Sequence, residues 1–313
     1  MSYPIEIIDT DEKHRLYTEF MKRPLFSRKA NIYGCCIKFI ADDRSQEDLW
    51  SDNFFTADEN NRSHGRILAM HDPSQPLHVK YDPLTKTAFI YNFDYYGWIK
   101  SVALAIAGDI LEDAHEIYSV HGAALDNSGS GVALIAKSGV GKTTHSWGML
   151  RNPGVRLVSD DWFFVRIYEH SALAFGSEKN NYVDTDLGKI WGAYGNVLEK
   201  AVVDKNGRAI VNARWVVGAD GVVPITTMKK IFLLKRDPTD QSVVREISAD
   251  EAKQILIEND FFNPHQLVRD RRKNELRTAF FKDLISKTRA FMANTSQSPQ
   301  IVQDAIFKAA TSS

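Results

Sequence analysis

The chain has 313 residues, of which 39 are basic and 40 acidic, giving a formal net charge of −1. This length predicts one large domain and a smaller one, and the balanced charge argues against a nucleic-acid or membrane-surface partner. No apolar run approaches the roughly 20 residues that a membrane span needs, and residues 1–6 lack the pattern of a secretion signal. We therefore expect a cytoplasmic protein, with its only cysteines, Cys35 and Cys36, reduced and buried in a strand.

Residues 1–94 read as a small α+β domain without recognisable chemistry. Apolar runs bounded by turn residues predict its strands, and the polar stretch 42–64 predicts an exposed loop. The predicted strands are 35–40, 77–81 and 86–91.

Residues 95–118 carry apolar side chains at helical spacing and predict an amphipathic helix that packs on the sheet that follows it. Residues 120–125 then form a predicted strand. A polar turn at 126–131 returns the chain into the apolar run 131–135. We place the start of a second, catalytic domain, 95–313, at this helix.

The stretch 136–144, Ala-Lys-Ser-Gly-Val-Gly-Lys-Thr-Thr, follows a strand and opens a helix, which is typical of a phosphate-binding loop. Loop N–H groups and the helix N-terminus favour an anion. Lys142 is expected to reach the β- and γ-phosphates, and Thr143 to ligate Mg²⁺. The first glycine of the motif is replaced by Ala136, which is small but takes glycine-only dihedrals less readily. The nucleotide-binding residues predicted here are Ser138, Gly139, Val140, Gly141, Lys142, Thr143 and Thr144.

A short strand, 155–158, ends in Ser159-Asp160-Asp161. Carboxylates at a strand end shortly after a phosphate-binding loop are placed to bind a metal or accept a proton, although a surface turn is an alternative. Residues 176–182 predict a loop containing Glu178, which fits a solvated or a functional role equally well. Arg214 could help to spread γ-phosphate charge, or be structural.

The remaining chain predicts a buried strand and three helices. The strand is 228–234, and the helices are 250–257, 271–292 and 298–308. A basic cluster favours a solvated helix face, with a phosphate contact as the alternative. Its members are Arg269, Arg271, Arg272, Lys273 and Arg277.

Three pieces in order, 121–126, the phosphate-binding loop and 157–161, resemble the catalytic domain of the HPr kinase/phosphorylase family. More distantly they are similar to ATP-dependent phosphoenolpyruvate carboxykinase. The resemblance is sharp over residues 120–165. It implies an α/β phosphate-loop kinase domain of HPr kinase/carboxykinase type, preceded by a small N-terminal α+β domain.

The resemblance also implies roles. Lys142 and Thr143 would bind phosphate and Mg²⁺. Asp160 would be the general base and Asp161 a metal ligand, or the two aspartates would have these roles the other way round. His121 would lie beside the transferring phosphoryl group or be a buried structural histidine. Glu178 falls where the family has a second metal carboxylate, but the surrounding family motif, Glu-Ile-Arg-Gly-Leu-Gly, is missing here.

The function expected from residues and resemblance together is an ATP- and Mg²⁺-dependent kinase that phosphorylates a hydroxyl of a protein, peptide or small molecule. A carboxykinase-like lyase and a nucleotide-sensing module without transfer are the alternatives. GTP is not excluded, and the sequence does not decide between a monomer and a homo-oligomer.

Overall fold

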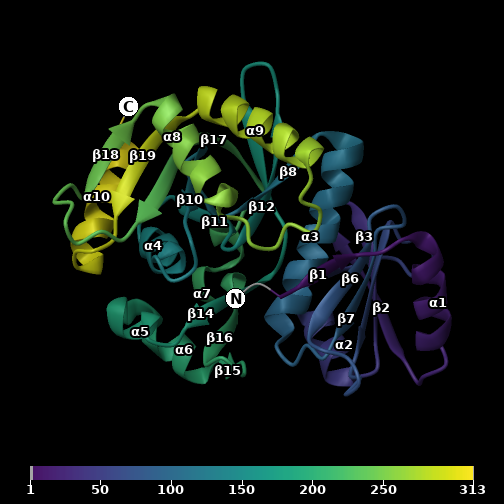
Figure 1. Cartoon of the computed structure of the whole chain (residues 1–313). Coiled ribbons are helices and arrows are strands. Elements are labelled where there is room, and N and C mark those ends of the chain that lie inside the picture. The colour runs from purple at the N-terminus through teal and green to yellow at the C-terminus, as the bar shows by residue number, and fades with distance from the viewer. Residues whose placement is uncertain (1–2, 313) are drawn as a thin grey trace. The chain divides into compact units, whose positions relative to one another are not determined.

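A computed structural model describes residues 3–312, and the chain divides into two compact units. The first contains the chain up to Glu116 together with Pro264–Lys273, and the second contains Ile117–Asn263 and the chain from Asn274 (Figure 1). The sequence placed the boundary at 94/95. The compact units divide later because the helix α3 (Tyr96–His115) packs on strands of the first unit. The fold is mixed α/β, as expected.

The first unit is built on a seven-stranded mixed sheet of order β1-β6-β7-β5-β3-β2-β4. Cys35 and Cys36 are buried and free in β3, as predicted, and burial raises the pKa of Cys35 to about 11. The strands are β1 (Ile5–Ile7), β2 (Phe26–Ile32), β3 (Cys35–Ala41), β4 (Phe55–Thr56), β5 (Gly65–Met70), β6 (His78–Asp82) and β7 (Thr87–Tyr91), and helix α1 is Thr10–Phe20.

The predicted loop 42–64 was wrong in part, because it contains helix α2 (Arg44–Asn53). The Asp43 side chain accepts a hydrogen bond from Ser45 N and caps the helix. Trp50 is buried and stacks on Phe39 with ring centroids 4.8 Å apart. One buried tryptophan therefore anchors an otherwise polar helix.

Helix α3 was predicted to pack on the following sheet, and it instead contacts β3, β5 and β7. It ends at His115 and is followed by Glu116, which has a left-handed backbone (φ 54°), so residues 117 and 118 belong to the next strand rather than to the helix.

Lys273, predicted to lie on a solvated helix face, is buried against α3. Its ammonium lies 2.8 Å from Asp109, 2.9 Å from Glu112 and 2.8 Å from Asp113. Lys86 also pairs with Asp109 and Asp113, each at 2.6 Å. This ion network, comprising these five residues, holds the returning segment 264–273 on the first unit.

The second unit contains a nine-stranded sheet with the path β11-β9-β10-β17-β13-β12-β8, extended by β18 and β19. Strands β10, β17 and β19 are parallel, and β9 runs antiparallel between β10 and β11. The carboxyl ends of β11, β10, β17 and β19 therefore share one edge. The strands are β8 (Ile117–His121), β9 (Ala123–Asn127), β10 (Ser130–Ile135), β11 (Val155–Ser159), β12 (Trp162–Ile167), β13 (Ala172–Gly176), β17 (Ile225–Lys235), β18 (Val244–Ile247) and β19 (Arg289–Asn294).

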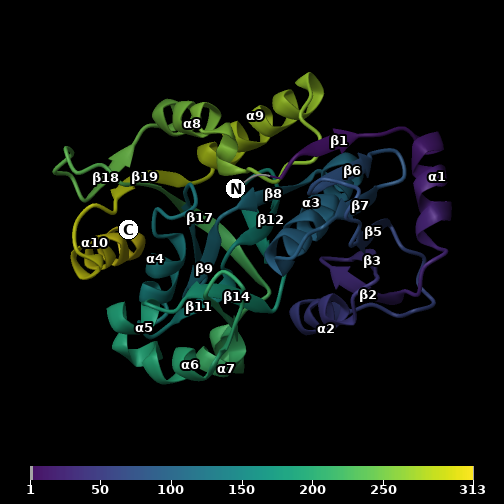
Figure 2. The ribbon, with the colours of Figure 1, turned by 60° about the horizontal axis from the view of Figure 1, so that its bottom comes forward.

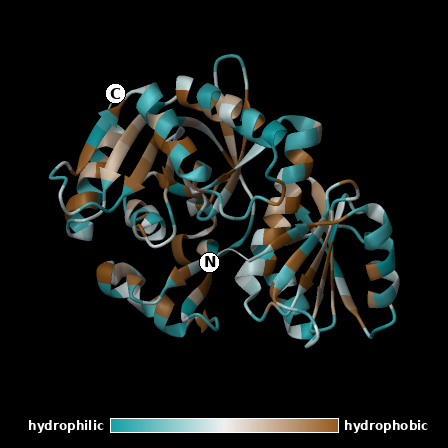
Figure 3. Cartoon of the chain, in the orientation of Figure 1, coloured by the Kyte–Doolittle hydropathy of each residue, from teal (hydrophilic) through white to brown (hydrophobic). Residues whose placement is uncertain are grey.

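Alternation along β10 gives this sheet two apolar faces. Val132 and Leu134 join the core formed with α4 (Lys142–Met149) and α10 (Pro299–Thr311), which lie side by side in Figure 2. Ala133 and Ile135 join the core formed with α8 (Ala249–Glu258) and α9 (Arg271–Ser286). Hydrophobic residues accordingly run along the strands, while hydrophilic ones gather on loops and helix surfaces (Figure 3).

The predicted helix 271–292 was too long, because α9 ends at Ser286 and β19 follows. The residues of β19 pair in parallel with β17, from Lys230 opposite Arg289 to Lys235 opposite Asn294. Within residues 3–312, no helix is long and apolar enough to cross a membrane.

A small lobe of the second unit packs against α4. Its three-stranded sheet has the order β14-β16-β15, and β14 begins at Asn180 within the predicted loop 176–182. Trp191 Nε1 donates to Thr144 O (2.7 Å), and the Tyr194 hydroxyl donates to Trp147 O (2.9 Å). The elements are β14 (Asn180–Asp184), α5 (Leu187–Ile190), α6 (Gly195–Lys200), β15 (Val202–Val203), β16 (Arg208–Asn212) and α7 (Ala213–Val217).

Candidate phosphate-binding and catalytic site

The predicted phosphate-binding loop, residues 136–144, joins β10 to α4. Ala136 is fully buried and has no positive φ, so the alanine fits where the motif carries glycine. The positive φ values fall on Gly139 (79°) and Gly141 (110°), where a side chain would be strained. A Cβ on Gly141 would also lie 3.3 Å from the His145 ring. Both glycines are therefore required by the backbone.

The loop presents uncommitted donors. Lys137, Ser138 and Gly139 are exposed, and no side chain caps the first turn of α4. The Lys142 ammonium makes no hydrogen bond or ion pair with any other residue in the range 3–312. Free N–H groups at a helix N-terminus, together with an unpaired lysine, suit a polyphosphate.

Beneath the loop, His145 is buried and neutral. Burial lowers its pKa to about 4. In the orientation that satisfies its amide, Gln303 of α10 donates to His145 Nδ1 (3.2 Å) and accepts from Met149 N (3.2 Å). Thr295, after β19, donates from its hydroxyl to Val140 O (2.7 Å). These contacts fix the backbone of the loop from below.

Asp160 lies beside the first turn of α4. The residue is 4% exposed, and its carboxylate accepts a 2.6 Å hydrogen bond from the Ser146 hydroxyl. Ser146 stands one helical turn after Thr143 and contacts Thr143 O at 3.1 Å. This contact brings the acid at the end of β11 next to the phosphate-binding loop.

Asp161 pairs with His121. Its Oδ1 lies 3.2 Å from His121 Nε2, and Gly122 N donates to Asp161 O at 2.9 Å. His121 Nδ1 donates to Phe262 O (2.7 Å), so both ring nitrogens face oxygen atoms. His121 is thus buried and backbone-bonded, as the structural alternative held, and also touches the carboxylate pair.

The turn that supplies Phe262 O is strained. Asp260, Phe261 and Phe262 have consecutive φ values of 52°, 51° and 54°. Left-handed backbone costs about 1–2 kcal/mol per non-glycine residue. Packing offsets this, because Phe261 stacks on Phe281 (5.1 Å) and the guanidinium of Arg277 lies 5.7 Å from the Phe261 ring. Strain of this kind concentrates at functional sites.

Arg277 was predicted to be solvated, and it is 1% exposed. Its guanidinium donates to Ser119 O (3.0 Å) of β8, two residues before His121. Of the predicted basic cluster, Lys273 and Arg277 are therefore buried structural residues.

Glu178 and Arg214 lie on neighbouring segments. Ser177 is fixed by a hydrogen bond to Trp162 O (2.7 Å), and Asn180 pairs with Asn212, whose side chain accepts from Arg214 N (3.1 Å). Across the described chain, no group of three or more His, Cys, Asp or Glu side chains is arranged to hold a metal ion. Glu178 therefore does not join the two aspartates in such a group.

The structure links Asp160 through Ser146 to the turn that carries Thr143, and it pairs His121 with Asp161. Lys142 is the first residue of the same helix. Sequence reasoning missed Ser146 and the Phe262 carbonyl. Helical spacing puts Ser146 on the face of Lys142 and Thr143, which was a usable signal. The carbonyl lies 141 residues from His121 and had none.

Comparison with known proteins gave no match, either to a protein-family model or to a curated protein.

Proposed function

We propose that this chain is an ATP- and Mg²⁺-dependent kinase of HPr kinase type that transfers the γ-phosphoryl group to a hydroxyl of a protein, peptide or small molecule. The hydrogen bond between Ser146 and Asp160 carries the proposal, because it sets a strand-end carboxylate against the phosphate-binding loop. The uncommitted Lys142 and the pairing of His121 with Asp161 support it.

The donor set fits magnesium. Mg²⁺ keeps several waters and binds through one or two carboxylates plus substrate phosphates, so no three-carboxylate cage is needed. Thr143 and Asp160 would hold it, since Ser146 links Asp160 to the turn that carries Thr143. When bound, the metal would neutralise charge on the phosphates.

The resemblance assigned Asp160 as the general base and Asp161 as a metal ligand. The geometry favours the opposite division of these roles. Asp160 is buried and engaged by Ser146, which suits the metal side. The Asp161 side chain is 37% exposed and within reach of an incoming hydroxyl. Asp161 would accept the hydroxyl proton, and His121, held by Phe262 O, would orient its carboxylate. Lys142 would stabilise negative charge on the transferring phosphoryl group.

The first test is calorimetric titration with Mg-ATP. Lys142→Ala should weaken binding at least tenfold, because the loop loses its uncommitted charge. Lys137→Ala is the matched control, since this exposed lysine of the same loop precedes the glycines, and it should change affinity by less than threefold. Wild-type protein that binds neither ATP nor GTP would refute the proposal.

The second test is single-turnover release of phosphate from labelled ATP, with water replacing the acceptor. Asp161→Asn should slow the step about 10²–10⁴-fold with little change in nucleotide affinity. Asp160→Asn should instead raise the Mg²⁺ concentration required. Should Asp160→Asn lose the chemical step at saturating Mg²⁺ while Asp161→Asn keeps it, the original division of roles would hold.

A further inference from the structure

Arg236 follows the last residue of β17, which lies beside β10 in the sheet. It is exposed and makes no hydrogen bond or ion pair with any residue from 3 to 312. Its position at the carboxyl end of a central parallel strand is where open α/β sheets bind ligands. An unpaired arginine there is a candidate ligand contact.

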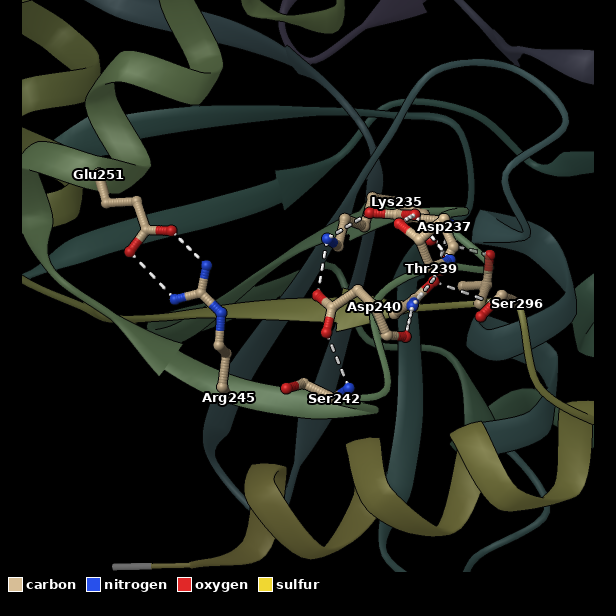
Figure 4. Close-up of polar contacts among 10 residues, drawn as sticks. Lys235, Asp237, Thr239, Asp240, Ser242, Arg245, Glu251 and Ser296 are labelled. Carbon is tan, nitrogen blue, oxygen red and sulfur yellow. Dashed lines mark hydrogen bonds and ion pairs between the residues drawn. The ribbon is translucent and has the colours of Figure 1, made fainter.

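The loop around Arg236 is fixed by its neighbours (Figure 4). Lys235 Nζ binds Asp237 (3.1 Å) and Asp240 (2.7 Å), so the two nearby carboxylates are both engaged by the lysine. Asn294 Nδ2 donates to Asp237 O (2.7 Å) and Asp240 O (2.8 Å). The backbone is thus held in place while the guanidinium of Arg236 remains available.

The same loop is bonded to the phosphate-binding loop. Thr295 N donates to Lys235 O (2.8 Å), and the Thr295 hydroxyl donates to Val140 O (2.7 Å). Thr295 therefore joins the loop that carries Arg236 to the phosphate-binding loop.

The strand order places the two ends of a bound nucleotide on opposite sides of β10. The carboxylates follow β11, two strands from β10 on one side, and Arg236 follows β17 on the other. If the γ-phosphate faces the carboxylates, the nucleoside leaves the loop toward β17. This placement of the nucleoside rests on the proposed nucleotide-binding function.

We propose that Arg236 forms the nucleoside subsite, with its planar guanidinium stacked on the base. Arginine stacks on aromatic faces more readily than lysine because its charge is delocalised and weakly hydrated. The contact would be to the base rather than to the phosphates, which the loop and Lys142 already serve.

The test compares Mg-ATP with Mg-tripolyphosphate, which has the phosphates and no nucleoside. Arg236→Ala should weaken ATP binding about 3- to 30-fold and leave tripolyphosphate unchanged. Arg236→Lys should recover little of the lost ATP affinity, because lysine restores the positive charge but not the planar guanidinium group. The matched control is Lys229→Ala, which removes an exposed cation without a described partner from the same strand, and it should behave as wild type.

Three outcomes would overturn the assignment. In the first, Arg236→Ala binds ATP with wild-type affinity. In the second, Arg236→Ala loses affinity for ATP and tripolyphosphate equally and Arg236→Lys restores both affinities, which would indicate a phosphate contact. If wild-type protein binds neither ligand, this inference falls together with the proposed function. Normal wild-type binding with an unaffected Arg236→Ala variant would refute the subsite alone.

Discussion

Replacing Lys273 with methionine should destabilise the first unit strongly. The lysine side chain is 3% exposed and its ammonium lies within 2.9 Å of three carboxylates. Methionine keeps much of the volume and removes the charge, which leaves Asp109 and Glu112, at 8% and 5% side-chain exposure, without this partner. Breaking a buried ion pair in this way typically costs about 3–5 kcal/mol.

The control is Arg272→Met. Arg272 pairs with Asp113 at 2.9 Å, but its side chain is 58% exposed. An exposed pair contributes about 0–1 kcal/mol. Urea unfolding followed by circular dichroism at pH 7 measures both variants. Equal losses below about 1 kcal/mol would refute the view that burial sets the strength of this network.

The pH dependence has a defined sign. Burial opposes the charged forms of Lys273 and Asp113, but ion pairing prevails. Asp109, followed by Asp113 and Glu112, raises the pKa of Lys273. Lys273, Lys86 and Arg272 lower the pKa of Asp113. The Asp113 contribution is present above its unfolded pKa of about 4 and lost as pH falls through the lower folded value. The Lys273 contribution is present below about pH 10.5 and lost as pH rises through the higher folded value. The difference in free energy of unfolding between wild type and Lys273→Met should therefore be constant from about pH 5 to 10.

Three further predictions concern the second unit. Gly122→Ala places a Cβ 2.8 Å from Leu134 O, so thermal unfolding should show a loss of about 1–3 kcal/mol, and a wild-type midpoint would contradict this. Trp191→Phe loses the hydrogen bond to Thr144 O and should lower the free energy of unfolding in urea by about 1 kcal/mol; an unchanged midpoint would count against that anchor. Because the folded pKa of His145 is about 4, wild type should lose up to ~3 kcal/mol between pH 6.5 and 4, and His145→Gln should flatten that slope.

Local order along the chain was enough to predict strand β10, the glycine-bearing loop, the start of helix α4, and the strand that precedes Asp160 and Asp161. Each depends on residues within a few positions of one another. Helix α2 was missed because its polar sequence has one fully buried large side chain, Trp50, and periodicity needs several. The spacing of Leu284 and Phe291 suits a continued helix, and pairing with β17 makes the second residue part of β19.

Long-range contacts explain the other misses. Lys273 and Arg277 belong to a locally basic run, and what buries them lies on α3 and β8, more than 150 residues earlier. The place of Arg236 depends on β17 lying beside β10, which no spacing reveals. The place of Asp160 and Asp161 at a strand end could be predicted, but their separate surroundings could not.

The return of residues 264–273 to the first unit has a consequence for synthesis on the ribosome. The ion network around Asp109 lacks Lys273 until about 150 further residues have been translated. At ~5–20 residues per second, this delay is roughly 8–30 s. Throughout that interval the nascent first unit carries Asp109, Glu112 and Asp113 on α3 without the Lys273 ammonium that pairs with all three. Domain-by-domain folding from the N-terminus is therefore interrupted in this chain, and its first unit is completed only when most of the second has emerged.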